Sequence, residues 1–329
     1  MKRQLFLSIC AVLILFCMGA MRFVSPALAQ GEVLGIHLLS PSELSQAQKL
    51  LETKNNTNHF VTVPLTYDDL GHKDRWQNFL NEAHDAHLTP LIRLTSRFEN
   101  GSWVVPNQAD IIKYVTFLSS LSWKDTDLTV ILFNEPNHAN EWGGGVDPEG
   151  YVRIADFATD WFKTEEKHYI VLPAGLDLSA NTSPGTMEEF TFWKRALADR
   201  PEFIEKLDGW TSHSYPNPGF ASDPWKTDKG SLRGYQHELT FLSGYTKKEL
   251  PVYITETGWN HDQLTNWELA RYYTVAYSQI WNNDPRIKAV TPFLLQGAPG
   301  TFAPFSFLDA HGNPTKSYDV YKSLVLMGQ

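Results

Sequence analysis

Two glutamates stand at the ends of short apolar runs, and they are the side chains best suited to chemistry. Glu135 follows the run Val130–Phe133 after one amide residue, Asn134, and Glu256 directly follows the run Pro251–Thr255. A carboxyl group can donate a proton when it is neutral, and it can accept a proton or attack as a nucleophile when it is ionised. Two carboxyls that meet at one site would divide acid–base and nucleophilic work between them.

The runs that position these residues belong to a repeating pattern of strand and helix. Short apolar runs rich in β-formers predict eight strands, over residues 33–39, 60–65, 89–94, 128–133, 169–173, 209–214, 251–255 and 289–295. Helical periodicity between them predicts helices after Ser40 and over 74–87, 107–121, 147–167, 186–198, 232–242, 269–281 and 315–326. Ser40, Asp147 and Thr265 supply recognisable helix starts, because each places an N-capping side chain before a proline or three residues before a glutamate.

Eight such units predict a single α/β domain over residues 30–329 with the closed (β/α)₈ architecture of a TIM barrel. Strands that are apolar throughout are expected where helices cover a parallel sheet, and the length suits a barrel. A doubly wound open sheet is the alternative, but no glycine-rich nucleotide loop follows the first strand. In a barrel, functional side chains lie at the C-terminal ends of strands, so Glu135 and Glu256 would share one rim.

A carboxyl pair at a barrel mouth suits the hydrolysis of glycosides. One carboxylic acid protonates the leaving oxygen, and one carboxylate attacks the anomeric carbon. If the two carboxyls lie about 5–5.5 Å apart, the reaction retains the anomeric configuration through a covalent intermediate.

At these residues the chain resembles the clan A retaining glycoside hydrolases, in which Asn-Glu-Pro closes strand 4 and a glutamate closes strand 7. The sequence Asn-Glu-Pro-Asn at 134–137 is similar to family 39 and the general layout is similar to family 5, so both families stay open. The resemblance implies that Glu135 is the general acid/base, that Glu256 is the nucleophile and that Asn134 binds the sugar 2-hydroxyl. It implies a β-linked oligosaccharide or polysaccharide as substrate and no cofactor.

Three further residues match or approach the clan's pattern. His213 and Tyr215, in the sequence Ser-His-Ser-Tyr-Pro, are similar to the clan's His-x-Tyr after strand 6. The tyrosine hydroxyl would hold Glu256 in position, and the histidine would bond to the sugar or to Glu135. Arg93, at the end of the third strand, would lower the pKa of Glu256 by proximity.

The end of the last strand departs from the clan's pattern. Many members carry a tryptophan there, under the sugar at the cleavage point, whereas this chain reads Thr-Pro-Phe-Leu-Leu-Gln over residues 291–296. Phe293, Gln296 or Trp259 would take that place. Trp142 and Trp259 follow the two glutamates in rim loops and are predicted sugar platforms.

The N-terminal segment is predicted to be removed on export. Lys2 and Arg3 precede an uncharged, mostly apolar run over residues 5–21, and Ala-Leu-Ala at 27–29 forms a small-x-small cleavage site. Residues 1–29 therefore read as a signal peptide of a secreted or cell-envelope protein. An uncleaved membrane anchor is the alternative.

Composition limits the partners of the chain. Removing residues 1–29 would leave 25 basic against 37 acidic residues and no cysteine. Such an acidic balance argues against nucleic acid and anionic membranes as partners. The sequence His138-Ala-Asn-Glu141 lacks the His-Glu-x-x-His spacing of a zinc helix, so no metal is expected. We expect a monomer without an obligatory protein partner.

Three activities are compatible with these residues. The first is hydrolysis by double displacement, with an open cleft and internal cleavage. The second is a carbohydrate-binding barrel without catalysis, whose signature would be the loss of a carboxylate. The third is a transglycosylase that uses the same residues.

Overall fold

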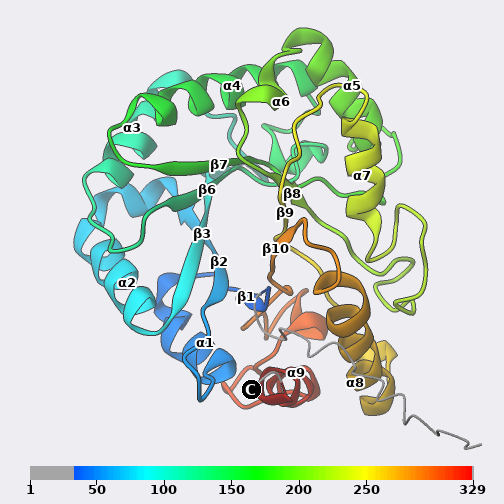
Figure 1. Ribbon diagram of the computed structural model, residues 1–329. Coiled ribbons are helices and arrows are strands. Elements are labelled where there is room, and N and C mark those ends of the chain that lie inside the picture. The colour runs from blue at the N-terminus through cyan, green and yellow to red at the C-terminus, as the bar shows by residue number, and fades with distance from the viewer. Residues whose placement is uncertain (1–32, 328–329) are drawn as a thin grey trace, which may run out of the picture.

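The apolar runs of the sequence form parallel strands in a computed structural model that describes residues 33–327 (Figure 1). All eight predicted strands are present, most of them shorter than predicted. The barrel strands are β1 (Gly35–His37), β2 (His59–Thr66), β3 (Leu88–Thr95), β6 (Leu128–Leu132), β7 (Tyr169–Pro173), β8 (Trp210–Ser212), β9 (Val252–Ile254) and β10 (Ile287–Val290). The connection after β3 also holds a small antiparallel hairpin, β4 (Phe98–Glu99) and β5 (Ser102–Trp103), which the sequence pattern did not predict.

The strands close into a barrel through two junctions between their sheets. One parallel sheet has the order β1-β2-β3-β6-β7 and the other the order β10-β9-β8. Leu34 and Val290 join the first pair of edges in a parallel bridge, in which Val290 N donates to Val33 O at 2.7 Å. Asp177 and His213, just beyond β7 and β8, form a parallel bridge at the other junction. The closed barrel prediction is therefore confirmed, and the open doubly wound sheet is wrong.

Helices form an outer ring around the strands, with α9 beside α1 where the ring closes (Figure 1). They are α1 (Leu44–Leu51), α2 (Lys73–Asp85), α3 (Gln108–Ser119), α4 (Pro148–Thr164), α5 (Glu189–Asp199), α6 (Phe203–Lys206), α7 (Gly234–Leu242), α8 (Asn266–Val275) and α9 (Lys316–Met327). Asp147 caps α4 by accepting from Gly150 N at 2.9 Å, and Thr265 caps α8 by accepting from Glu268 N at 3.2 Å. The segment predicted as a helix over 269–281 is helical throughout, but its second half, Ala276–Trp281, is a π-helix that follows α8 without a gap.

The barrel interior is packed below the rim. Leu91, Ile131, Leu172 and Ala289, from four different strands, form a fully buried apolar cluster, as expected for the layered core of such a barrel. Nearer the C-terminal strand ends the buried residues become polar. These include His37 and a pair of threonine hydroxyls, Thr62 and Thr291, that lie 2.8 Å apart. The core therefore supports the strands below and leaves polar groups at the mouth.

The predicted signal peptide, residues 1–29, lies outside the residues that the structure describes. Within the described range 33–327, none of the helices has the length and apolar character needed to cross a bilayer.

A pair of carboxyls lies buried behind β8, away from the barrel mouth. Glu189 on α5 and Glu238 on α7 are 0% and 1% exposed, and Trp210 Nε1 donates to Glu238 Oε1 at 2.9 Å. Burial and the neighbouring Glu238 carboxyl raise the pKa of Glu189 well above its usual range, and burial likewise raises the pKa of Glu238. The folded protein therefore holds a proton on this pair that the unfolded chain releases near pH 4.5.

The folded state binds this proton more tightly than the unfolded chain does, so the protonated pair stabilises the fold. This stabilisation is complete below pH 4.5 and is lost as the pH rises through the raised pKa values. Glu189→Gln mimics the protonated form at every pH. We expect this variant to gain stability over the wild type as the pH rises from 5 to 8. Urea unfolding measures the gain, and the exposed Glu202→Gln serves as control. A difference that does not change with pH would contradict the assignment.

Candidate active site

The turn after β6 presents Glu135 to the barrel mouth. Phe133 and Glu135 have positive φ angles of 76° and 31°, which are uncommon for residues with a side chain. Two backbone bonds hold this turn: Glu135 N donates to Gly175 O at 3.0 Å, and His138 N donates to Glu135 O at 2.8 Å. Such conformations persist only where the surroundings impose them, and they cluster at functional sites.

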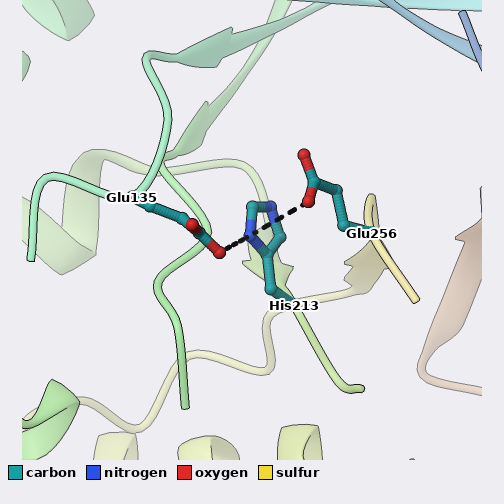
Figure 2. A group of neighbouring side chains, drawn as sticks. All are labelled: Glu135, His213 and Glu256. Atoms are coloured by element: carbon teal, nitrogen blue, oxygen red, sulfur yellow. Dashed lines mark hydrogen bonds and ion pairs between the residues drawn. The ribbon is translucent and has the colours of Figure 1, made fainter. Parts of the chain in front are cut away.

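The two predicted catalytic carboxyls face each other across the mouth, with His213 between them (Figure 2). Nδ1 of His213 lies 2.7 Å from Glu135 Oε1 and 3.9 Å from Glu256 Oε2. One carboxylate oxygen of each glutamate and the histidine nitrogen all lie within 4.8 Å of one another. The carboxyls are therefore close to the separation of about 5–5.5 Å that a retaining mechanism uses, and nearer than the roughly 6.5–9.5 Å of an inverting one.

The Glu256 carboxylate is buried in a set of groups that favour its ionised form. Arg93 Nη1 donates to Oε1 at 2.5 Å, and the Tyr215 hydroxyl donates to Oε2 at 3.1 Å. Burial opposes the charge, but His213 and then Arg93 outweigh it and lower the pKa of Glu256. Glu256 is accordingly held as a carboxylate with both oxygens oriented, which is the state that a nucleophile needs.

His213 reaches Glu135 from the end of β8 and is fully buried. Burial disfavours its charged form, but the negative charges of Glu256 and Glu135 outweigh that effect and raise the pKa of His213. Gly175 makes the approach possible, since a Cβ at this position would lie 2.4 Å from the His213 ring.

Asn134 is held between a cation and an acid. Its Oδ1 accepts from Arg93 Nη1 at 2.7 Å, and its Nδ2 donates to Glu141 Oε2 at 3.2 Å. Burial raises the pKa of Glu141 to about 7. The bond from Arg93 thus links the amide to the Glu256 carboxylate.

These groups line a cavity of about 400 Å³ at the C-terminal end of the barrel. This volume lies within the range of small-molecule sites. Its lining comprises Leu39, Arg93, Thr95, Trp103, Asn134, Glu135, His138, Glu141, Asp177, Tyr215, Phe220, Glu256, Phe293, Phe302 and Phe305. Polar groups from the ends of β3, β6 and β9 thus meet phenyl rings carried by the loops after β8 and β10.

Two predicted sugar platforms are corrected by the structure. Trp142 and Trp259 are 2% and 1% exposed and do not line the cavity. The first packs edge-on against Phe133 and Tyr151, while the second packs against Tyr273. Buried indoles of this kind anchor the rim loops and have no face free for a sugar.

The place at the end of β10 is taken by Phe293, which lines the cavity and meets the His37 ring edge-on at 5.2 Å. Gln296, predicted as a contact residue, is half-buried and is not among the lining side chains. Trp103 does line the cavity, although the sequence analysis did not single it out. Trp103 lies in β5 of the hairpin after β3, so it is not at the C-terminal end of a barrel strand, where functional residues were expected.

Sequence reasoning missed several other polar groups at this site. His37 ends β1 and lies with Nε2 3.8 Å from Glu256 Oε1; burial lowers its pKa to about 3, so it is neutral. The rule that strand ends carry functional groups could have found it. His138 Nε2 lies 3.0 Å from Asp177 Oδ2, which raises the pKa of the histidine. This pair comes from two different loops, so only the tertiary structure joins it.

Glu135, His213 and Glu256 together have the atom types of a metal site. Each of these atoms, however, already faces a protein partner, and Arg93 places a positive charge 2.5 Å from Glu256. That charge would repel a divalent cation, so the arrangement suits acid–base and nucleophilic chemistry better.

Comparison with known proteins supports the fold. No protein-family model matches the chain, and a search of curated proteins gave no match. Among solved structures, a glucosidase from Croceicoccus marinus has a TM-score of 0.64 at 10% identity, covering 90% of this chain and 67% of that one. An endo-laminarinase from Formosa Hel1_33_131 has a TM-score of 0.57 at 14% identity, covering 92% and 90%. A beta-mannanase from Streptomyces thermolilacinus has a TM-score of 0.55 at 14% identity, covering 90% of each chain.

This chain has the fold of these glycosidase barrels. At identities of 10 to 14% the likeness concerns the fold, and the chemistry of this chain must be argued from its own side chains.

Gly175→Ala tests whether the close approach of His213 to Glu135 is built into the fold. The added methyl would meet the His213 ring at 2.4 Å, so we expect a loss of about 1–3 kcal/mol in unfolding free energy and a displaced imidazole. Chemical denaturation and a crystal structure measure the two effects. Gly185→Ala is the matched control, because nothing lies within 4 Å of a Cβ there. Equal stability of the two variants would contradict the packing described.

Proposed function

We propose that this protein is a retaining β-glycosidase that hydrolyses O-glycosidic bonds of a β-linked oligosaccharide or polysaccharide. The observation that carries the proposal is the carboxyl pair. An oriented and ionised Glu256 faces Glu135 across the barrel mouth, with carboxylate oxygens within 4.8 Å. The fold, shared with a glucosidase, a mannanase and a laminarinase, supports it.

In the first step Glu135 donates a proton to the glycosidic oxygen while a Glu256 oxygen attacks the anomeric carbon. The bond to the leaving group breaks, and a glycosyl ester of Glu256 forms. In the second step Glu135 accepts a proton from a water molecule, whose oxygen attacks the same carbon and releases Glu256. Two inversions leave the configuration unchanged.

The neighbouring groups assist each carboxyl in its role. Arg93 and Tyr215 aim the two oxygens of Glu256 and keep it ionised before attack. His213 bonds to Glu135 at 2.7 Å and fixes the direction of the acid. The resemblance implies that Asn134 binds the sugar. Its side chain lies near Glu256, because Arg93 Nη1 donates to both residues, and it directly precedes Glu135 in the sequence.

The cavity favours an uncharged glycan. Among the described lining residues, Arg93 is the one permanently charged cation, and it is already paired with Glu256. Four acidic residues, Glu135, Glu141, Asp177 and Glu256, line the same cavity beside uncharged groups such as Asn134 and Tyr215. A uronic acid or a sulfated sugar would meet repulsion there, whereas phenyl rings such as Phe293 can pack on the apolar faces of neutral sugars.

We infer that the mouth extends past one sugar, which favours internal cleavage. Trp103 and Phe302 border the cavity from opposite loops, after β3 and after β10, and Phe302 is half exposed. We propose an endo-acting, exported monomer that needs no cofactor and no protein partner. A transglycosylase would use the same residues and would reveal itself by transfer products when an acceptor sugar is added.

The first test uses residues 30–329 with a panel of β-linked polysaccharides and aryl β-glycosides. We expect hydrolysis of at least one, no detectable hydrolysis by Glu256→Ala, and a loss of about 10²–10⁴-fold in Glu135→Gln. The exposed Glu249→Gln is the control and should act like the wild type. Proton NMR should show the β-anomer as first product. Binding of a glycan without cleavage of any would favour the non-catalytic barrel.

The pH profile tests the charge of Glu256. Arg93 is one of the groups that hold the pKa of Glu256 down, so its removal in Arg93→Met must raise that pKa. We expect the acidic limb of kcat/KM to move to higher pH by about one unit or more. Arg97→Met, which removes an arginine paired with Glu99 instead, should leave the limb in place. An unmoved limb in Arg93→Met would show that Glu256 is not the ionising nucleophile.

A further inference from the structure

The turn after β6 carries a second carboxyl into the cavity, six residues beyond Glu135. Glu141 ends a short 3₁₀ turn, Ala139–Glu141, and its backbone N donates to His138 O at 3.0 Å. The next residue, Trp142, is buried against Phe133 and Tyr151. This indole anchors the turn in the core, so Glu141 is held in a defined place at the cavity wall.

From there Glu141 reaches one residue of the proposed catalytic machinery. Its Oε2 accepts from Asn134 Nδ2 at 3.2 Å, while Asn134 Oδ1 accepts from Arg93 at 2.7 Å. The amide thus has an acid on one side and a cation on the other. The reverse orientation would turn Oδ1 toward a carboxylate and the NH₂ group toward a guanidinium, and both contacts would be repulsive.

We propose that Glu141 is a positioning residue for the glycosidase reaction: together with Arg93 it fixes the orientation of the Asn134 amide and leaves the second Nδ2 hydrogen for the sugar. This inference rests on the proposed function. An amide nitrogen has two hydrogens, and Glu141 takes one of them. The second Nδ2 hydrogen is left for the cavity, because the Asn134 side chain lines it beside Glu135. A sugar hydroxyl placed there therefore meets a donor whose direction is set before binding.

The charge of Glu141 depends on the groups around it. Burial raises its pKa to about 7, and the charges of Glu135 and Glu256 act in the same direction, whereas Asn134 and Arg93 act against it. His138, which precedes the same turn, also interacts with the charge of Glu141, and that charge helps to raise the pKa of the histidine. Above pH 7 the bond from Asn134 is assisted by a full negative charge, and below pH 7 it has a neutral acceptor.

The decisive comparison is between Glu141→Gln and Glu141→Ala. Both remove the charge near Glu135, but only glutamine keeps an acceptor for Asn134. We expect Glu141→Ala to lower kcat at least tenfold below Glu141→Gln, with KM changed less than threefold, since a misplaced group acts mainly on the transition state. In an Asn134→Ala background this difference should shrink to less than about twofold, because the group through which Glu141 acts is gone.

The pH dependence separates positioning from mere packing. At pH 6 the wild type should lie within about threefold of Glu141→Gln, and its advantage should grow through a midpoint near pH 7 as Glu141 ionises. A structural role alone would give a ratio that is constant with pH. Thermal unfolding of all variants checks that they are folded.

Crystal structures of the wild type, Glu141→Gln and Glu141→Ala test the inference without relying on activity. We expect the Asn134 amide to keep its bond to Arg93 in the first two and to be turned or displaced in the third. An unmoved amide in Glu141→Ala, or an undiminished effect of that substitution in the Asn134→Ala background, would overturn the inference. If the wild type cleaves no glycoside, the proposed function fails, and the amide orientation is still decided by the structures.

Discussion

Burial of one negative charge is the constraint on which the rest of this site depends. The Glu256 carboxylate is 7% exposed, and an isolated charge at such depth would take up a proton. His213 and Arg93 hold the pKa of Glu256 down against burial, and Arg93 at 2.5 Å and the Tyr215 hydroxyl at 3.1 Å bond to its two oxygens. These partners come from β3 and from the loop after β8, so barrel closure is what brings them to Glu256.

Arg93 also orients residues that do not contact Glu256. The Nη1 of Arg93 also donates to Asn134, and Asn134 in turn donates to Glu141. On the other side, His213 lies between the carboxyls of Glu135 and Glu256 and bonds to Glu135. Charges of alternating sign therefore run across the mouth, and each acid faces a donor. The two carboxyls therefore differ in environment: Arg93 and Tyr215 enclose that of Glu256, whereas that of Glu135 is bonded to His213 and is more exposed.

Two of the tryptophans hold rim loops, and phenyl rings line much of the cavity. Trp142 secures the turn that carries Glu135 and Glu141, and Trp259, three residues after Glu256, is buried against Tyr273. Phe293 and Phe302 take the cavity positions instead. Indoles in the segments that carry Glu135 and Glu256 thus serve rigidity, which matters because a displacement of about 1 Å can cost two orders of magnitude in rate.

The sequence by itself determined the eight strands, the closed barrel and the placement of Glu135 and Glu256 at one rim. Apolar period and helix caps are local properties, and parallel strands necessarily bring their C-terminal ends to one rim. Only the tertiary structure decided which side chains meet there. It turned Trp142 and Trp259 inward, brought Trp103 from an unpredicted hairpin to the cavity, and joined His138 to Asp177. These outcomes depend on loop conformation and on pairings between distant segments, and neither is encoded in local periodicity.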